Sequence, residues 1–315
     1  MFYKGKKVLV TGAGGLVGTQ VAKLLLEQGA QVRGTYRNRE VPSWVGELET
    51  MQCNFMNLED VKKAVEGMDI VFVCSANTSG AGVMAHDPLQ HITPNLIMNS
   101  TLMEESYRAG VERFFFVSSA TTYPPADYPI KEEEVFDGEP YKTYFGVGWM
   151  KRYTEILGQF YHRNNLMKIA MVRPANIYGV QGEFSDETGH VLPALIRRAL
   201  EKQDPYVVWG NPDVVRDFTH SKDMARACLD VVEKYAVCDP INIASGNLVT
   251  IGESVDLILK CANHNVTPQY DETKPVTIQY RALDTTKAKD VIGYKPTIAF
   301  EDGIQETVDW IRENM

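Results

Sequence analysis

A glycine-rich turn near the start of the chain constrains the fold more than any other feature. Residues 11–18 read TGAGGLVG and follow the apolar run of residues 7–10. Gly12 permits a tight turn, Gly15 lets the main chain approach a pyrophosphate, and Gly18 allows a helix to pack closely on the preceding strand. The start of that helix offers unpaired N–H groups and the positive end of a dipole to phosphates. An ordinary glycine turn is the alternative, but the strand before it and the amphipathic helix after it favour a dinucleotide site. The residues expected to contact the dinucleotide here are Gly12, Gly14, Gly15, Leu16, Val17 and Gly18.

Strand and helix patterns alternate through the first half of the chain. Strands are expected at residues 7–11, 31–35, 51–53, 70–74, 113–118 and 168–173, and helices at 16–28, 59–66, 95–109 and 149–161. The alternation predicts an α/β protein with a doubly wound, parallel Rossmann sheet. Shorter elements after residue 175 predict a smaller C-terminal α/β subdomain that binds the substrate. We expect the dinucleotide-binding domain at 1–175, with 217–245 returning to it, and the substrate subdomain at 176–216 and 246–315.

Composition narrows the possible partners. The net charge is −9 and the Lys and Arg residues are dispersed, which argues against nucleic acid as a partner. No apolar run is long enough to span a membrane, and the N-terminus is expected to enter the first strand without room for a signal peptide. The five cysteines are scattered and lack metal-ligand spacing. We therefore expect free thiols in a reducing cytoplasm and no metal site.

Three further segments complete a recognisable pattern. They are residues 118–124 (SSATTYP), 173–179 (RPANIYG) and 216–223 (RDFTHSKD). With the glycine turn, they make the chain similar to the extended short-chain dehydrogenase/reductase superfamily, in its nucleotide-sugar epimerase and dehydratase branch. Residues 189–198 followed by 208–210 (VWG) resemble the GDP-fucose synthase group most. The resemblance implies an NAD(P)-dependent epimerase or reductase acting at C4 of a hexose on a nucleoside diphosphate, with a GDP-sugar favoured.

Several polar residues follow predicted strands. The Ser119 hydroxyl comes directly after a buried strand, where it can hydrogen-bond a sugar oxygen; capping of the turn is the alternative. Arg216 can bind diphosphate oxygens bidentately, or form a surface salt bridge with Asp213 or Asp217. Ligands of open parallel sheets bind beyond the carboxyl ends of the strands, so the loops after residues 11, 74, 118 and 173 are expected to share one cleft. Further cofactor contacts are expected from Ser75, Ala76, Pro174 and Asn176, and substrate contacts from Ser119, Asn176, His190, Val191, Arg198, Trp209 and Arg216.

The superfamily uses Tyr-x-x-x-Lys on one helix, and this chain departs from that motif. The resemblance implies that Lys151 is the family lysine, which lowers the pKa of the tyrosine phenol and holds the nicotinamide ribose. Val147 stands four residues earlier, where the tyrosine is expected, and Tyr144 stands three residues before Val147. Three interpretations stay open. Tyr144 swings in because two nearby glycines loosen the helix start; the proton passes through Ser119, Thr121 or water; or the site binds ligands without turnover.

A second departure concerns epimerisation. In GDP-fucose synthases a Cys and a His act as acid and base beside the keto group, and the resemblance places Thr121 and His190 at those two positions. The pKa of a threonine hydroxyl is far too high for this work, whereas the reference pKa of His, about 6.5, suits proton transfer at neutral pH. His190 alone is compatible with a single epimerisation or with plain reduction of a 4-keto sugar.

The residues after the second strand bear on the choice of cofactor. NAD-binding chains usually place an acid at the end of that strand, where it accepts hydrogen bonds from the ribose hydroxyls. Here Thr35 and Tyr36 occupy that place, and Arg37 and Arg39 follow. Because guanidinium groups attract a 2′-phosphate, NADP is favoured, with NAD held by Thr35 and the main chain as the alternative. Asn54 is expected to contact the adenine edge.

The competing interpretations are a nucleotide-sugar epimerase or reductase, a reductase of another carbonyl substrate on the same fold, and a catalytically silent binder of dinucleotides or sugar nucleotides. The resemblance also implies a homodimer through the helices at 95–109 and 149–161. The apolar positions that form either this dimer contact or intramolecular core are Leu96, Leu102, Met103, Tyr153, Ile156 and Leu157.

Overall fold

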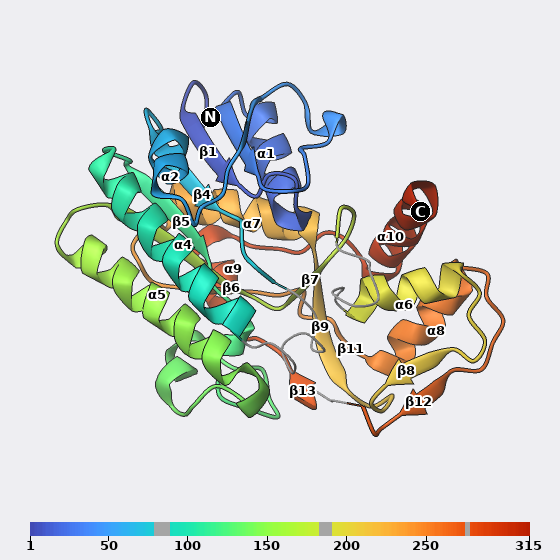
Figure 1. The fold of residues 1–315 in the computed structure, drawn as a ribbon. Coiled ribbons are helices and arrows are strands. Elements are labelled where there is room, and N and C mark those ends of the chain that lie inside the picture. Colours follow the sequence, from blue (N-terminus) through green and yellow to red (C-terminus); the bar gives the residue numbers. More distant parts are fainter. Residues whose placement is uncertain (79–88, 183–190, 275–277) are drawn as a thin grey trace.

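The computed structural model describes residues 1–78, 89–182, 191–274 and 278–315. Its centre is a seven-stranded sheet in the order β10-β6-β5-β4-β1-β2-β3, in which every neighbouring pair is parallel (Figure 1). The strands are β1 (Lys7–Thr11), β2 (Gln31–Tyr36), β3 (Glu49–Gln52), β4 (Ile70–Val73), β5 (Arg113–Val117), β6 (Lys168–Pro174) and β10 (Ile241–Ile243). This is the doubly wound Rossmann sheet expected from the sequence, so the predicted fold class is confirmed.

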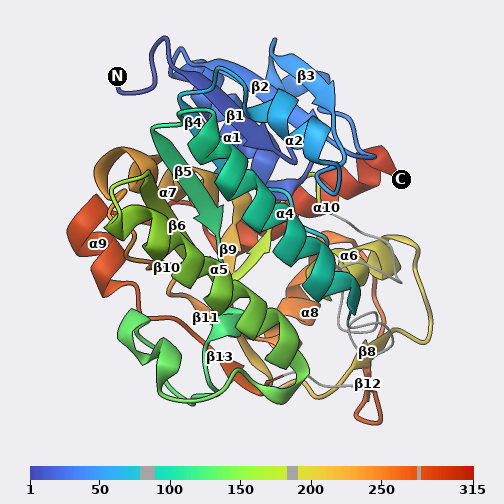
Figure 2. The ribbon, with the colours of Figure 1, turned by 60° about the vertical axis from the view of Figure 1, so that its left-hand side comes forward.

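Helices cover both faces of this sheet, which explains why its strands are apolar on both sides. Side chains of β1 alternate: Val8 and Val10 join one core cluster and Leu9 joins the other. The first cluster lies under α1 (Leu16–Glu27), α7 (Ser221–Lys234) and α9 (Thr286–Ile292), and the second under α2 (Leu58–Val65), α4 (Leu89–Arg108) and α5 (Phe145–Arg163). Figure 2 shows α4 and α5 side by side on their face of the sheet.

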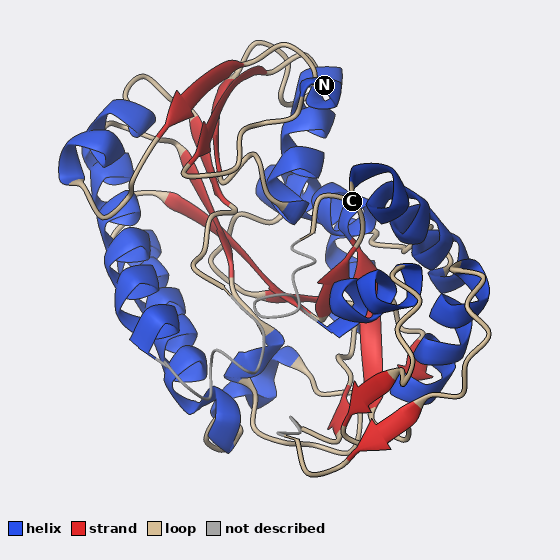
Figure 3. Ribbon diagram, turned by 45° about the vertical axis from the view of Figure 1, so that its right-hand side comes forward, coloured by secondary structure: helices blue, strands red, loops and turns tan. Residues whose placement is uncertain are grey.

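The C-terminal half adds a second, smaller group of elements, seen apart from the main sheet in Figure 3. Its strands are β7 (Asn176–Tyr178), β9 (Val215–His220), β11 (Leu248–Thr250) and β13 (Tyr280–Arg281), with β8 (Val207–Trp209) and β12 (Gln269–Asp271) forming a separate pair. The helices α6 (Val191–Leu200), α8 (Ile251–Cys261) and α10 (Phe300–Asn314) enclose a third core cluster. After β9 the chain returns to the main sheet with α7 and β10. The domain limits themselves stay predictions.

Two helices start earlier than expected. α4 begins at Leu89 rather than at residue 95 and carries Pro94 inside it. Proline removes a hydrogen-bond donor from a helix interior, so the sequence suggested a later start. α5 begins at Phe145 rather than at residue 149 and continues through Gly146 and Gly148. No described helix is long and apolar enough to cross a bilayer.

Candidate active site

The glycine turn has the geometry that a pyrophosphate needs. Gly12 has a φ of +66°, and a Cβ there would lie 2.9 Å from the Cα of Ser75. A Cβ on Gly18 would lie 2.2 Å from the carbonyl oxygen of Gly12, so both positions require glycine. The N-cap of α1 makes no side-chain hydrogen bond, and within the described part of the chain the main-chain N–H groups of Leu16 and Val17 meet no acceptor. An anion placed before α1 would satisfy them, so these residues fit a dinucleotide phosphate.

Hydrogen bonds join the carboxyl ends of β1 and β4 beside this turn. The main-chain N–H groups of Cys74 and Ser75 both donate to Oγ1 of Thr11 at 3.1 Å, and the Thr11 and Ser75 hydroxyls lie 2.8 Å apart. Ser75 therefore packs against Gly12, and Ala76 follows it at the surface. The structure thus brings the predicted cofactor residue Ser75 to the glycine turn, and Ala76 is the next residue along the chain.

The loop after β2 lies over the glycine turn. A Cβ on Gly14 would come 2.1 Å from the carbonyl oxygen of Arg39, whose guanidinium donates to the carbonyl of Gln181 at 2.8 Å. Arg37 is exposed, whereas Thr35 is fully buried. Arg37 and Arg39, the two predicted 2′-phosphate partners, are both exposed, and Arg39 is the one whose guanidinium also binds a main-chain carbonyl.

Asn54, expected at the adenine edge, is exposed and organises its own turn. Its side-chain oxygen accepts from the N–H of Met56 at 3.2 Å, and its main-chain N–H donates to Asp60 at 2.9 Å. The contact with adenine stays a prediction.

Ser119 and Thr121 lie directly beyond β5 and contact each other. Oγ of Ser119 accepts hydrogen bonds from the main-chain N–H of Thr121 at 3.1 Å and from its hydroxyl at 2.9 Å. The capping interpretation of Ser119 is therefore correct. It is compatible with a functional role, because an oxygen that accepts twice keeps its own proton for a third partner. Thr121 thus leaves Ser119 able to donate to a ligand oxygen.

Lys151 reaches the same strand end from α5. Its ammonium donates to the carbonyl of Val117 at 2.7 Å and lies 4.6 Å from the centre of the Phe116 ring. Burial lowers the pKa of Lys151 to about 8, against the opposing effect of the Glu155 carboxylate. The structure therefore brings Lys151 and Ser119 to the end of one strand; the sequence placed Ser119 just past that strand, and the catalytic roles of both residues stay predictions.

Tyr144 and Val147 stand at the start of α5. Val147 is partly buried one turn before Lys151, and Tyr144 is the residue just before the helix. The two glycines between Tyr144 and Lys151 are helical and closely packed: a Cβ on Gly148 would lie 2.5 Å from the carbonyl oxygen of Thr121. The Tyr144 ring lies 4.5 Å from the guanidinium of Arg281. The structure thus places Tyr144 against an arginine that the sequence analysis did not single out.

Arg216 is buried in β9, 7% exposed, so its guanidinium does not lie at the surface. Its guanidinium donates to the carbonyls of Ile278 at 2.6 Å and Val215 at 2.7 Å. The parallel register of β9 and β13 sets Arg281 beside Arg216. Burial, and then the charge of Arg281, lower the pKa of Arg216 to about 10. Two adjacent guanidinium groups favour an anion between them. The sequence analysis missed Arg281, and the signal that could have found it is an arginine at the end of the VTIQY run.

The other predicted substrate residues lie in or near the second group of elements. The amide of Asn176 donates to the carbonyl of Asp217 at 3.2 Å, and Arg198 donates to the carbonyl of Val207 at 3.0 Å. Trp209 is 46% exposed, and the ammonium of Lys274 lies 5.8 Å from the centre of its ring. Val191 is exposed at the start of α6, Pro174 is buried at the end of β6, and His190 lies outside the described residues.

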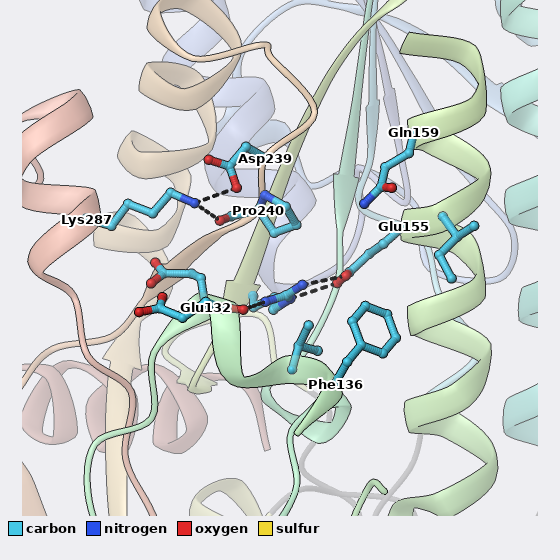
Figure 4. A pocket seen from close by; sticks show the side chains of 11 residues that line it. Glu132, Phe136, Glu155, Gln159, Asp239, Pro240 and Lys287 are labelled. Carbon is cyan, nitrogen blue, oxygen red and sulfur yellow. Dashed lines mark hydrogen bonds and ion pairs between the residues drawn. The ribbon is translucent and has the colours of Figure 1, made fainter. Parts of the chain in front are cut away.

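A pocket of about 220 Å³ lies on another flank of α5 (Figure 4). Its lining includes Glu155 and Arg173, whose guanidinium binds the carboxylate bidentately at 2.7 and 3.0 Å, and none of the predicted site residues. Both partners are buried. This ion pair connects β6 to α5, the helix that carries Lys151. The pocket therefore lies beside a contact that positions α5, and it is separate from the candidate active site.

A parallel sheet with a phosphate-binding glycine turn, and a lysine and serine at a strand end, define a dinucleotide-dependent α/β enzyme. The model of the NAD dependent epimerase/dehydratase family matches residues 8–244, and the chain belongs to that family. It is therefore an NAD(P)-dependent enzyme of the extended short-chain dehydrogenase/reductase type.

Individual relatives agree with this assignment. A putative GDP-L-fucose synthase 2 of Arabidopsis thaliana is 28% identical over 100% of this chain and 94% of its own length. A GDP-mannose 3,5-epimerase 1 of Oryza sativa subsp. japonica is 27% identical over 98% of this chain and 82% of its own length. The structure of UDP-glucose 4-epimerase from Thermotoga maritima, solved with UDP-glucose, is 25% identical with a TM-score of 0.86 and covers 98% of this chain and 99% of that one.

Proposed function

We propose that this enzyme acts at C4 of a hexose carried on a nucleoside diphosphate, as a reductase or epimerase, with a GDP-sugar as the favoured substrate. The observation that carries the proposal is the pairing of Arg281 with buried Arg216, which offers an anion site in a chain of net charge −9. A diphosphate between a sugar and a nucleoside matches two adjacent guanidinium groups. The relatives named as acting on GDP-sugars support GDP as the carrier.

Named residues can then be given roles. The nicotinamide cofactor supplies or accepts the hydride when bound. Ser119 donates a hydrogen bond to the oxygen on C4, since Thr121 occupies its lone pairs. Lys151 holds the cofactor ribose and adds positive charge near the reacting oxygen. Trp209 offers an exposed aromatic face to the nucleoside, and His190 serves as the proton-transfer group where epimerisation occurs.

NADP is the proposed cofactor. The exposed guanidinium of Arg37 directly follows β2, where an NAD-binding chain carries a carboxylate. A 2′-phosphate would pair with this guanidinium. Positions 35 and 36 are Thr35 and Tyr36, so neither carries a carboxylate that would repel the phosphate. Titration of the protein with NADP and NAD compares the two directly, and tighter binding of NAD would overturn this choice.

The first experiment combines the purified protein with GDP-, UDP-, CDP- and dTDP-sugars and either NADP or NAD. The absorbance of the reduced nicotinamide is followed alongside thermal stabilisation. Turnover with one nucleotide series establishes the reaction and names the carrier. Stabilisation without an absorbance change leaves a redox-neutral epimerase or a silent binder, which deuterium incorporation from heavy water separates. No response to any sugar nucleotide would refute the proposal.

The second candidate function, a binder without turnover, is favoured by Val147. We expect Val147→Tyr to raise turnover at least about tenfold, because a positioned general acid contributes roughly 10²–10⁴-fold. Val147→Phe is the matched control, since it adds the ring without the hydroxyl. Equal effects of the two substitutions, or no effect of either, would show that the phenol is not the missing part.

We also propose a homodimer through α5. Large apolar side chains on one stripe of this helix are exposed: Phe145, Trp149, Tyr153, Ile156 and Phe160. Of the positions expected either in the dimer or in the core, Leu102 and Met103 are intramolecular core, whereas Tyr153 and Ile156 are exposed. A second copy of the same face would cover the stripe.

A further inference from the structure

Tyr144 has two interpretations that the structure separates. It is either a substitute for the missing phenol beside Lys151 or part of the anion site. We propose that Tyr144 is a positioning residue that holds Arg281 against Arg216 to receive a diphosphate, and that it is not the substitute acid. The inference rests on the proposed function, because the diphosphate belongs to the nucleotide-sugar substrate.

The first support is the contact itself. The guanidinium carbon of Arg281 lies 4.5 Å from the centre of the Tyr144 ring, a distance at which the negative face of the ring attracts a cation. Both side chains are partly exposed. Arg281 therefore has a defined resting place against an aromatic face beside the site.

The second support is the difference between the two arginines. Arg216 is fixed, because its guanidinium donates to the main-chain carbonyl of Val215 in β9 and to those of Ile278 and Gln279, which directly precede β13. Arg281 stands in the matching register position of a strand only two residues long. The two positive charges repel, and the lowered pKa of Arg216 reflects that repulsion after the effect of burial. A neighbouring ring face is what keeps Arg281 from turning away.

The third support is where Tyr144 stands on the chain. It precedes α5, whose first turns pack on the turn of Ser119 and Thr121 through Gly148. The same helix start therefore contacts both the proposed reacting centre and the arginine pair. Tyr144 would set the position of the diphosphate relative to the hydroxyls that act on the sugar. A substitution at Tyr144 should therefore change the affinity for the substrate.

The test measures binding of GDP, UDP and inorganic pyrophosphate by calorimetry at fixed ionic strength. We expect Tyr144→Ala to weaken binding about tenfold and Tyr144→Phe to stay within about twofold of the wild type, because the ring face is retained. Tyr107→Ala is the control, since Tyr107 is an exposed tyrosine on α4 whose ring lies against Tyr161. In an Arg281→Ala background, Tyr144→Ala should add almost nothing, because the two residues act through one contact.

Each contrary result has a distinct meaning. Unchanged affinity in Tyr144→Ala, with a wild type that binds GDP or UDP, overturns this inference and leaves the proposed function intact. A wild type that binds neither the nucleotides nor pyrophosphate overturns both. Unchanged affinity with turnover at least about a hundredfold lower in Tyr144→Phe would show that the phenol is the acid after all. If the alanine variant fails to fold, Tyr144→Leu takes its place, because it keeps apolar bulk and removes the aromatic face that contacts Arg281; affinity unchanged in Tyr144→Leu overturns the inference.

Discussion

Lys151 carries a charge where the surrounding protein disfavours one. Its ammonium is held by the carbonyl of Val117 and an aromatic ring, with the Glu155 carboxylate as the charge that favours it. An ammonium in such a place is ready to meet hydroxyls or an anion, because a bound ligand replaces part of the hydration it has lost. In the protein without ligand, burial of this charged group lowers the free energy of unfolding.

This destabilisation by Lys151 depends on pH and decreases as the pH rises. Folding lowers the pKa of Lys151 from its ordinary value of 10.5 to about 8, so between these values the unfolded chain binds more protons and stability rises with pH. We expect Lys151→Met to be more stable than the wild type near neutral pH, by at most about 3 kcal/mol. The gain should shrink as the pH rises above about 8. Urea unfolding of both proteins without cofactor checks this. A difference that does not change with pH would contradict it.

The helix α5 joins the parts of the site, and its glycines are needed for packing. Alanine normally stabilises a helix interior by about 1 kcal/mol relative to glycine. At Gly148, however, the added Cβ would meet the carbonyl oxygen of Thr121 at 2.5 Å, and overpacking typically costs about 1–3 kcal/mol. We expect Gly148→Ala to destabilise the protein and to displace Thr121. The measurements are urea unfolding and ligand affinity.

Gly158 of the same helix is the matched control. A Cβ there would lie 3.3 Å from a methyl group of Ile169, which can move by the few tenths of an ångström required. We expect Gly158→Ala to stay within about 1 kcal/mol of the wild type. If the two substitutions had equal effects, the close contact at Gly148 would not be what fixes the start of α5.

Short sequence patterns were enough to predict the elements whose structure depends mainly on neighbouring residues in the chain. The glycine turn, the apolar parallel strands and the lysine on α5 follow from short stretches, because a parallel strand buried on both faces reads as a continuous apolar run. Arg281 escaped prediction because β13 has two residues and pairs with β9, more than sixty positions away. The contact between Tyr144 and Arg281 depends on that pairing. Tertiary packing also decides that α5 continues through two glycines.

At the scale of the whole molecule, the two halves are tied together around the site. The carboxylate of Asp217 in β9 accepts from the N–H groups of Ser245 and Gly246, which follow the edge strand β10 of the main sheet. Arg39 beside the glycine turn donates to Gln181 after β7. Both sets of contacts link the cofactor side to the elements that carry Arg216.

The stripe of α5 lies on the face of that helix away from Lys151 and gives the last prediction. Its members are 39–57% exposed, and a contiguous apolar patch on a folded chain usually marks an interface. We expect light scattering to show a dimer at micromolar concentration. Ile156→Glu should produce monomers, because two copies of the new carboxylate would be buried together at a symmetric interface. Val237→Glu, at an equally exposed apolar residue outside α5, is the control and should remain dimeric. A monomeric wild type would refute the dimer, whereas an Ile156→Glu variant that stays dimeric would place the interface on another face.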